Sequence, residues 1–257
     1  MLTISPLFSG SRGNCTLVRA DNVNILLDAG YHYKQIVARL TEFNLTPADV
    51  NAIVLTHEHS DHISALPYLT RGMQTRVYAP EAICGIVSQR TFCSEVLPVN
   101  GRFEIEGVEI DVYQCSHDSV DCLGYKFTYG KQSVASVTDT GRCDDALADF
   151  LSDCKGILLE SNHDVDMLTN GPYPYQLKRR ILSDFGHLSN DQTAQVIAKL
   201  KGSAVKHLVL AHLSEQNNTK EIAFDCAVKA LNSAGLTEGK DVKIYVADQY
   251  ANRITIC

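Results

Sequence analysis

The amino-acid sequence predicts an α/β fold in a single domain that spans residues 1–257. Segments with the pattern of strands and segments with helical periodicity interleave along the chain. No Pro-, Gly- or Ser-rich linker divides it into two halves. The chain has 257 residues, 45% of them hydrophobic and 21% charged, which is typical of soluble globular proteins and sufficient for a sizeable core.

Short apolar runs rich in β-branched residues predict the strands. They span residues 2–8, 16–19, 23–27, 52–55, 76–78, 95–99, 108–114, 124–128, 133–137, 156–159, 207–210 and 242–246. Apolar residues spaced three and four apart predict the helices. They span residues 33–43, 63–71, 80–88, 144–153, 175–183, 191–200 and 221–234.

Charge and cysteine content narrow the class of protein. With 23 basic and 30 acidic residues the net charge is −7, so the chain lacks the basic excess of a protein that coats nucleic acid. An enzyme that binds phosphates locally remains possible, because bound divalent ions add positive charge. The nine cysteines include no C-x-x-C pair and predict buried thiols in a reducing cytoplasm. No signal peptide or membrane-spanning run is recognisable, so we expect a cytoplasmic protein without membrane association.

The strongest functional signal is an H-x-H-x-D-H run formed by His57, His59, Asp61 and His62. It follows the strand at 52–55 and precedes the predicted helix at 63–71. Imidazole and carboxylate groups suit zinc, manganese or iron. His57 and His59 share one side of an extended segment and can bind one ion, whereas Asp61 and His62 turn away and can bind a second. The alternative is a polar loop that is merely rich in histidine.

With this motif, the chain resembles the metallo-β-lactamase superfamily over most of its length. The superfamily pattern also has an aspartate after an early strand, a lone histidine after a later strand, a second aspartate, and a histidine after a C-terminal strand. In this chain Asp28, His117, Asp139 and His212 match those four positions in the family order. The resemblance implies a four-layer αββα sandwich with a dinuclear metal site at one edge.

The resemblance also implies a role for each matching residue. The first of two divalent ions, Zn or Mn, would bind His57, His59 and His117. The second would bind Asp61, His62 and His212. Asp139 would bridge both ions and hold a shared hydroxide that attacks phosphorus. Asp28 would orient the 57–62 loop by hydrogen bonds. Asp118, beside His117, is an alternative ligand.

Further motifs narrow the resemblance to one group. The 72 residues from position 140 to position 211 leave no room for the domain that β-CASP nucleases insert there. The segments 9–14, 160–164, 186–190 and 210–214 resemble those of the YycJ/WalJ group of bacterial metallohydrolases. That resemblance implies a metal-dependent exonuclease that degrades double-stranded DNA from the 5′ end in DNA repair. Duplex DNA ends would then be its partner.

Several residues outside the ligand set are candidates for contact with substrate. Ser11, Arg12 and Asn14 lie in a Gly- and Ser-rich loop that either binds a phosphate or is only a hairpin turn. His163 and His187 either protonate the leaving oxygen or are structural histidines.

Arg179 belongs to the basic run 178–180, which lies close in sequence to Tyr173 and Tyr175. This run either contacts the DNA backbone or forms a solvated helix face.

Other functions remain open at this stage. The same chemistry suits a small, cyclic phosphodiester, and the fold also serves thioester and lactone hydrolases. A metal-bound scaffold or DNA-binding factor without turnover is the alternative outside enzymes. A groove that leads from the basic residues to the metals would favour the nuclease.

Overall fold

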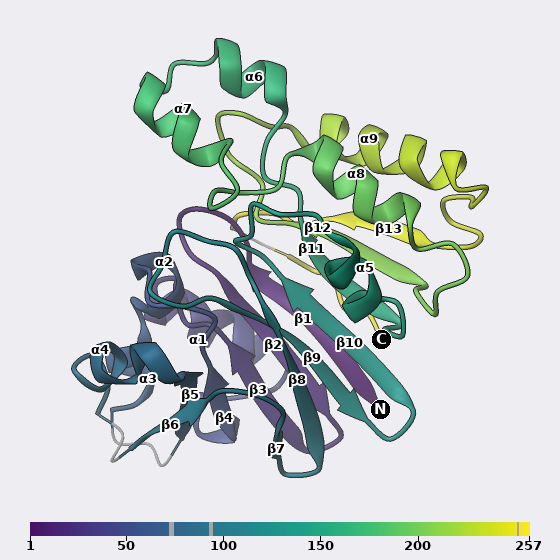
Figure 1. The fold of residues 1–257 in the computed structure, drawn as a ribbon. Coiled ribbons are helices and arrows are strands. Elements are labelled where there is room, and N and C mark those ends of the chain that lie inside the picture. Colours follow the sequence, from purple (N-terminus) through teal and green to yellow (C-terminus); the bar gives the residue numbers. More distant parts are fainter. Residues whose placement is uncertain (72–74, 93–94, 251) are drawn as a thin grey trace.

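Two β-sheets lie face to face at the centre of the molecule (Figure 1). The structure is a computed structural model that describes residues 1–71, 75–92, 95–250 and 252–257. In the first sheet the strands follow chain order: β1 (Leu2–Phe8), β2 (Cys15–Ala20), β3 (Val23–Leu27), β4 (Ala52–Val54), β5 (Arg76–Pro80) and β6 (Val96–Val99). The second sheet runs from β7 to β13 in reverse order: β7 (Phe103–Ile105), β8 (Val108–Gln114), β9 (Leu123–Tyr129), β10 (Gln132–Val137), β11 (Gly156–Glu160), β12 (His207–Ala211) and β13 (Lys243–Val246).

Helices cover the outer face of each sheet, which gives the predicted four-layer αββα arrangement (Figure 1). The first sheet is covered by α1 (Tyr33–Glu42), α2 (Ser60–Ile63), α3 (Leu66–Leu69) and α4 (Cys84–Ser88), with the short 3₁₀ helices η1 (Pro47–Asp49) and η2 (Glu81–Ile83). The second sheet is covered by α5 (Asp145–Leu151), α8 (Asn190–Ala198) and α9 (Lys220–Ser233).

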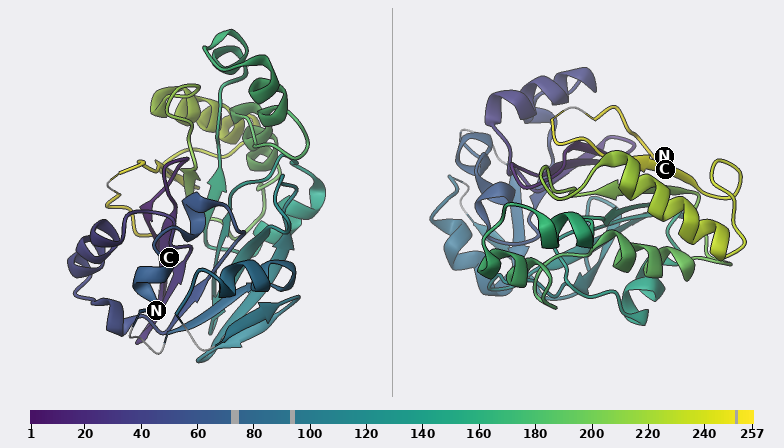
Figure 2. Two further views of the ribbon diagram at one scale, coloured as in Figure 1. Left: turned by 90° about the vertical axis from the view of Figure 1, so that its left-hand side faces the viewer. Right: turned by 90° about the horizontal axis from the view of Figure 1, so that it is seen from above.

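Two helices stand apart from these layers. They are α6 (Val165–Asn170) and α7 (Tyr175–Ile181), and they form an arm beyond one end of the sandwich in both side views (Figures 1 and 2).

Three apolar cores correspond to the interfaces between layers. Side chains of both sheets interleave in the central core, for example Ile4 and Ile25 from the first sheet and Tyr125 and Phe127 from the second. Each outer core joins one sheet to its helices. Strands such as β3, β4, β11 and β12 are therefore buried on both faces, which explains why they consist of nearly continuous apolar runs.

Strand direction places many strand ends at one edge. In the first sheet β3 runs parallel to β4, and in the second β10, β11 and β12 are mutually parallel. Strand β9 is antiparallel to both β8 and β10, so β8 runs in the same direction as β10. The carboxyl ends of β8, β10, β11 and β12 consequently lie at one edge of the second sheet, and those of β3 and β4 lie together in the first sheet. Such an edge is the usual place for a ligand site in an α/β protein.

Three sequence-based element predictions need correction. Residues 63–71 were expected to form one helix, but the chain forms α2 and then α3, with Pro67 in the first turn of α3, where a proline is tolerated. The break lets the backbone N–H of Ala65 bond to the carbonyl of Ala29. Strand β7 and helix α6 were not predicted because three and six residues are too short to show a period. Within the described part of the chain, no helix has the length and apolar character needed to cross a membrane.

Gly30, three residues after the end of β3, provides a test of how tightly the 57–62 loop is packed. A Cβ atom on Gly30 would lie 1.5 Å from the backbone oxygen of Asp61, whereas a Cβ on Gly85 would meet nothing within 4 Å. We therefore expect Gly30→Ala to lower the free energy of unfolding by more than about 3 kcal/mol. Gly85→Ala, inside α4, should change it by less than about 1 kcal/mol or raise it. Denaturant unfolding of both variants measures the difference, and equal stabilities would contradict this packing.

Candidate metal centre

The candidate site lies where the two sheets present the carboxyl ends of their strands. Asp28 directly follows β3, and Thr56 and His57 follow β4 after one intervening residue. From the second sheet, His117, Asp139 and His212 follow β8, β10 and β12, while Glu160 closes β11. Residues distant in sequence thus converge because parallel strands end together.

The structure brings the seven predicted metal ligands into overlapping clusters. One cluster contains His57, His59 and His117, and another contains Asp61, His62 and His212. Two further clusters contain Asp139: one joins it to His57 and His62, the other to Glu160, His187 and His212. Within each cluster the potential ligand atoms lie within 4.8 Å of one another. Their assignment as ligands stays a prediction.

Unpaired buried atoms in this centre fit divalent cations. Within the described residues, the Nε2 atoms of His57 and His212 and the Oδ2 atom of Asp139 are buried without a hydrogen-bond partner. Such groups are costly to bury unless something else binds them. Imidazole nitrogen and carboxylate oxygen are suitable ligands for zinc or manganese. The donor set therefore suits divalent cations, and Asp139 shares clusters with residues of both three-residue sets.

Asp28 anchors the ligands that the first sheet provides. Its carboxylate is 3% exposed and accepts hydrogen bonds from the backbone N–H of Thr56 at 2.8 Å and from Nδ1 of His62 at 2.8 Å. The hydroxyl of Thr56 lies 2.9 Å from Nδ1 of His57 and also contacts Asp28. With both Nδ1 atoms engaged, Nε2 is the nitrogen of each ring that could bind an ion, and among the described residues Nε2 of His57 has no hydrogen-bond partner.

Glu160 has the equivalent place in the second sheet, and sequence reasoning missed it. Its carboxylate is fully buried; Oε1 lies 2.7 Å from Nδ1 of His187 and 3.1 Å from Nδ1 of His212. The backbone N–H groups of Thr140 and Leu188 donate to Oε2. The available signal was a carboxylate directly after the apolar run 156–159. A carboxylate at the end of a strand that is buried on both faces is shielded from solvent and needs partners within the protein.

The carboxylates control the protonation of the buried histidines. Burial lowers the pKa of His57 well below its usual value, and the neighbouring His62 lowers it further. For His62 burial also lowers the pKa, but Asp28 and Asp139 outweigh it and raise the pKa well above the usual value. For His212 burial again lowers the pKa, but Asp139 and Glu160 outweigh this effect and raise the pKa to about 9. Without an ion, protons on His62 and His212 therefore balance the carboxylates.

Three residues of the centre adopt a backbone conformation that is rare for residues other than glycine. Asp28, Asp139 and His212 have φ values of 63°, 59° and 56°. This left-handed conformation costs free energy and persists where the surrounding structure enforces it, often at functional sites. In each case it occurs within two residues of the end of a strand, where it turns the chain sharply.

The loop 9–14 reaches the centre with one of its three candidate residues. Asn14 is 7% exposed, and its Nδ2 lies 3.0 Å from Nε2 of His62 and 3.5 Å from Oδ2 of Asp61. Ser11 and Arg12 are exposed instead, and Arg12 forms an ion pair with Glu215 at 3.0 Å. Asn14 thus lies among the predicted ligands, whereas Ser11 and Arg12 lie on the surface.

The two candidate proton donors differ in their surroundings. The side chain of His187 is 17% exposed; its Nδ1 bonds to Glu160 and lies 3.6 Å from Oδ1 of Asp139. His163 is 1% exposed, burial lowers its pKa to about 4, and neither ring nitrogen has a partner among the described residues. His187 is the histidine that faces both the centre and solvent.

The basic run 178–180 lies on α7 of the arm. Arg180 binds both carboxylate oxygens of Asp118, whose Oδ1 also lies 3.4 Å from Nε2 of His117. Asp118 belongs to none of the metal-binding clusters found among the described residues. Arg179 lies over the ring of Tyr175, which is 74% exposed. The amine of Lys178 donates to the carbonyl of Thr169. Arg180 therefore ties the arm to the His117 loop, and Arg179 faces outward with Tyr175.

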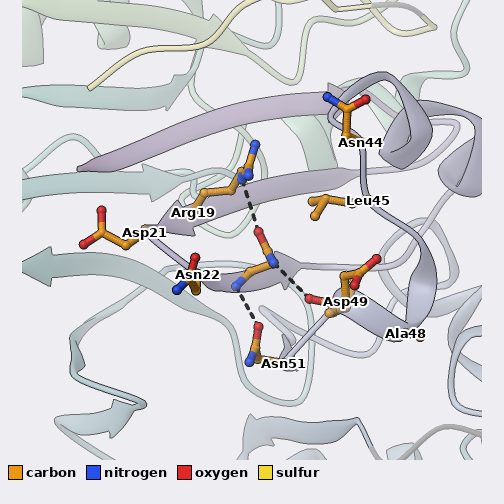
Figure 3. A pocket seen from close by; sticks show the side chains of 10 residues that line it. Arg19, Asp21, Asn22, Asn44, Leu45, Ala48, Asp49 and Asn51 are labelled. Atoms are coloured by element: carbon orange, nitrogen blue, oxygen red, sulfur yellow. Dashed lines mark hydrogen bonds between the residues drawn. The ribbon is translucent and has the colours of Figure 1, made fainter.

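A cavity of about 390 Å³ at the other end of β3 carries no comparable chemistry (Figure 3). Its central residue, Asn24, bonds to Arg19, to the carbonyl of Asp49 and to Asn51. Asn24 is four residues before Asp28 along the strand, which corresponds to about 13 Å. Because its polar groups satisfy one another, we interpret this cavity as structural.

Comparison with known proteins shows matching relatives over nearly the whole chain. The beta-lactamase superfamily domain matches residues 23–213. Exodeoxyribonuclease WalJ of Streptococcus pneumoniae is 37% identical over 248 residues, which cover 94% of this chain and 92% of the relative. Exodeoxyribonuclease YycJ of Bacillus anthracis is 36% identical over 255 residues, which cover 96% of each chain. The crystal structure of the metallo-β-lactamase fold protein YhfI from Bacillus subtilis has a TM-score of 0.75 at 14% identity. That alignment covers 99% of this chain and 98% of YhfI, a likeness of fold alone.

The raised pKa values of His62 and His212 predict that metal binding releases protons. A histidine must be neutral to bind a metal. At pH 7.5 both rings carry protons in the metal-free protein, so we expect Zn²⁺ to release about two protons. The apparent affinity should rise with pH, and its slope should become smaller above about pH 9, where His212 is already neutral. Calorimetric titration in buffers of different ionisation enthalpy counts the protons. His212→Ala should release one fewer, and a heat independent of the buffer would contradict the assignment.

Proposed function

The chain belongs to the metallo-β-lactamase superfamily, and from this premise we propose that it is an exonuclease that degrades double-stranded DNA from the 5′ end, acting in DNA repair. The observation that carries the proposal is the pair of three-residue donor clusters with Asp139 between them. Two-metal centres of this kind are suited to phosphodiester hydrolysis. The names of the relatives WalJ and YycJ support DNA as the polymer that is cleaved.

We assign the ion-binding residues as follows. His57, His59 and His117 would hold one divalent ion, Asp61, His62 and His212 would hold the other, and Asp139 would contact both. When bound, a pair of Zn²⁺ or Mn²⁺ ions would lower the pKa of a water between them and neutralise charge on the phosphoryl oxygens. Asp28 and Glu160 keep the histidines oriented through their Nδ1 atoms, which supports this division of roles.

His187 is the residue that we assign to protonate the leaving oxygen. Its Nδ1 is held by Glu160 at 2.7 Å, which leaves Nε2 free to donate a proton toward substrate. The buried carboxylate of Glu160 behind the ring fixes its orientation, as a positioned proton donor requires. The low pKa and full burial of His163 favour a structural role for that residue.

We propose that the arm binds the DNA backbone. Arg179 and the exposed ring of Tyr175 face outward from α7, where they can contact a phosphate and stack on a frayed base. The ion pair between Arg180 and Asp118 holds α7 beside the His117 loop. Ser11 and Arg12 extend the proposed DNA surface on the other side of Asn14, with Arg12 held by Glu215.

The free thiols support a further proposal about the environment of the protein. The eight cysteines that the structure describes are all unpaired, and four of them are buried. Such thiols are stable in a reducing compartment, so we propose that the protein acts in the cytoplasm.

The proposed function predicts digestion of DNA that depends on Asp139. Protein loaded with Mn²⁺ or Zn²⁺ should release short labelled products from linear duplex DNA labelled at its 5′ ends. Asp139→Ala and His59→Ala should abolish the release while the proteins stay folded, because each change removes part of the donor set. Digestion of duplex DNA labelled at its 3′ ends gives the polarity, because a 5′ exonuclease should release this label late. Intact DNA with both metals would reject the nuclease and favour a small phosphodiester as substrate.

The role of His187 predicts a loss of activity that a better leaving group restores. His187→Ala should slow cleavage of ordinary DNA by roughly 10²- to 10⁴-fold. The same variant should stay within about tenfold of wild type when the bridging oxygen that leaves is replaced by sulfur, because a thiolate needs no proton. Single-turnover rates on both substrates give the comparison. His163→Ala is the control, and an equal loss on the two substrates for His187→Ala would exclude it as the acid.

A further inference from the structure

A cavity beside the metal centre has no part in the roles assigned so far. Its volume is about 330 Å³, and it extends from His117 to the exposed ring of Phe185. The segment 113–122 forms one side, and Arg142, Asp144 and Phe185 form the other. We propose that this cavity holds the nucleobase of the nucleotide next to the cleaved phosphate, with the base stacked on Phe185. This inference rests on the proposed nuclease function and specifies how its substrate is held.

The position of Phe185 connects it directly to the centre. The next residue, Gly186, accepts a hydrogen bond at its carbonyl from Nδ1 of His117 at 3.1 Å. The residue after that is His187, the assigned proton donor. A base stacked on Phe185 would therefore lie beside the acid, two residues along the chain, and beside Gly186, which contacts the predicted ligand His117. The attached phosphate would then lie over the metal centre.

The surroundings of Phe185 are rigid. A Cβ on Gly141 would lie 2.5 Å from the backbone of Asp184 and Ser183, so the loop that follows Asp139 packs against the loop that carries Phe185. The N–H of Gly141 also donates to the carbonyl of Ser116 at 2.8 Å. A preformed site of this kind avoids the entropic cost of ordering a loop when a ligand binds.

Phe185 has the properties of a stacking surface. Phe185 is 56% exposed, so most of its ring is available to stack on a ligand. The guanidinium of Arg142 lies 5.9 Å from the ring centroid and is itself held by Asp184 at 3.1 Å. An aromatic ring fixed by its neighbours suits a base, because every base has a π face and stacking tolerates any sequence.

Charge and size favour a base over a phosphate. Asp121 and Asp144 line the cavity, and its one arginine, Arg142, is already paired with Asp184, so an anion would meet net negative charge. A volume near the lower end of the range for small-ligand sites, roughly 300–1,000 Å³, admits one nucleotide but not a duplex.

The chain contains a matched control for Phe185. Phe92 is 65% exposed and lies 5.6 Å from the guanidinium of Arg71, so it has the same chemistry as the Phe185–Arg142 pair. It lines none of the cavities described above. An effect found at Phe185 but not at Phe92 would therefore reflect the position of the ring and not the loss of an exposed phenylalanine.

The first experiment pairs the residue with the base. Wild type, Phe185→Ala and Phe92→Ala are compared on duplex DNA with a normal nucleotide, or an abasic one, next to the cleaved phosphate. We expect Phe185→Ala to lower kcat/KM on normal DNA by roughly 5- to 150-fold. Wild type should lose a similar factor on abasic DNA, and Phe185→Ala should lose nothing further there. Wild-type rates in Phe185→Ala, or independent losses that multiply, would overturn the proposal.

A second experiment separates the cavity from the nuclease activity. The chain has no tryptophan, so Phe185→Trp introduces a single indole whose fluorescence can be excited apart from that of the eleven tyrosines. In the metal-loaded protein, deoxyadenosine monophosphate should quench its fluorescence saturably, and deoxyribose 5-phosphate, which has no base, should not. Phe92→Trp should respond to neither compound. Saturable quenching without DNA cleavage would reject the exonuclease but retain the nucleotide site, whereas absence of quenching would reject the site itself.

Discussion

Two buried carboxylates, Asp28 and Glu160, hold the centre together from opposite sheets. Each closes or follows a strand that is buried on both faces, and each is at most 3% exposed. A carboxylate in such a place is tolerated only when hydrogen bonds and opposite charge compensate for lost hydration. The compensation comes from the histidines: His62 bonds to Asp28, and His187 and His212 bond to Glu160. The requirement to satisfy the carboxylates thus fixes the orientation of the imidazoles.

The same constraint links the fold to the chemistry. Because parallel strands end at one edge, the two carboxylates and the residues that follow neighbouring strands meet without any long excursion of the chain. The sharp left-handed turns at Asp28, Asp139 and His212 bring each side chain back over the strand ends. Free energy spent on these turns and on the buried charges is offset by the three apolar cores, each of which lies beside a sheet.

The sequence predicted those parts of the structure that are encoded locally. The run from His57 to His62 could be recognised as a metal-binding motif because its residues are close together in sequence and follow an apolar strand. Asp139 and His212 were identified through resemblance, since an isolated acidic or histidine residue after a strand has many structural explanations. Glu160 was missed because its two histidine partners lie 27 and 52 positions away. The break between α2 and α3 depends on the hydrogen bond between Ala65 and Ala29, which are far apart in sequence. The contacts Arg180–Asp118 and Phe185–Arg142 also join distant segments. No periodicity in the sequence reveals such contacts.

The arm packs directly against the segment that carries the assigned proton donor, His187. A Cβ on Gly186 would lie 2.1 Å from the carbonyl oxygen of Ile181 at the end of α7, so the chain folds back tightly on the arm just before His187. The backbone N–H of His187 donates to that same carbonyl at 3.1 Å. Near the end of α7, Arg180 forms an ion pair with Asp118 beside His117. A force that moved α7 would therefore move His187 and the His117 loop with it. DNA bound along the arm would meet the acid, the stacking ring of Phe185 and the metal centre in a fixed relative geometry, which is the condition for aligning one phosphate at a time.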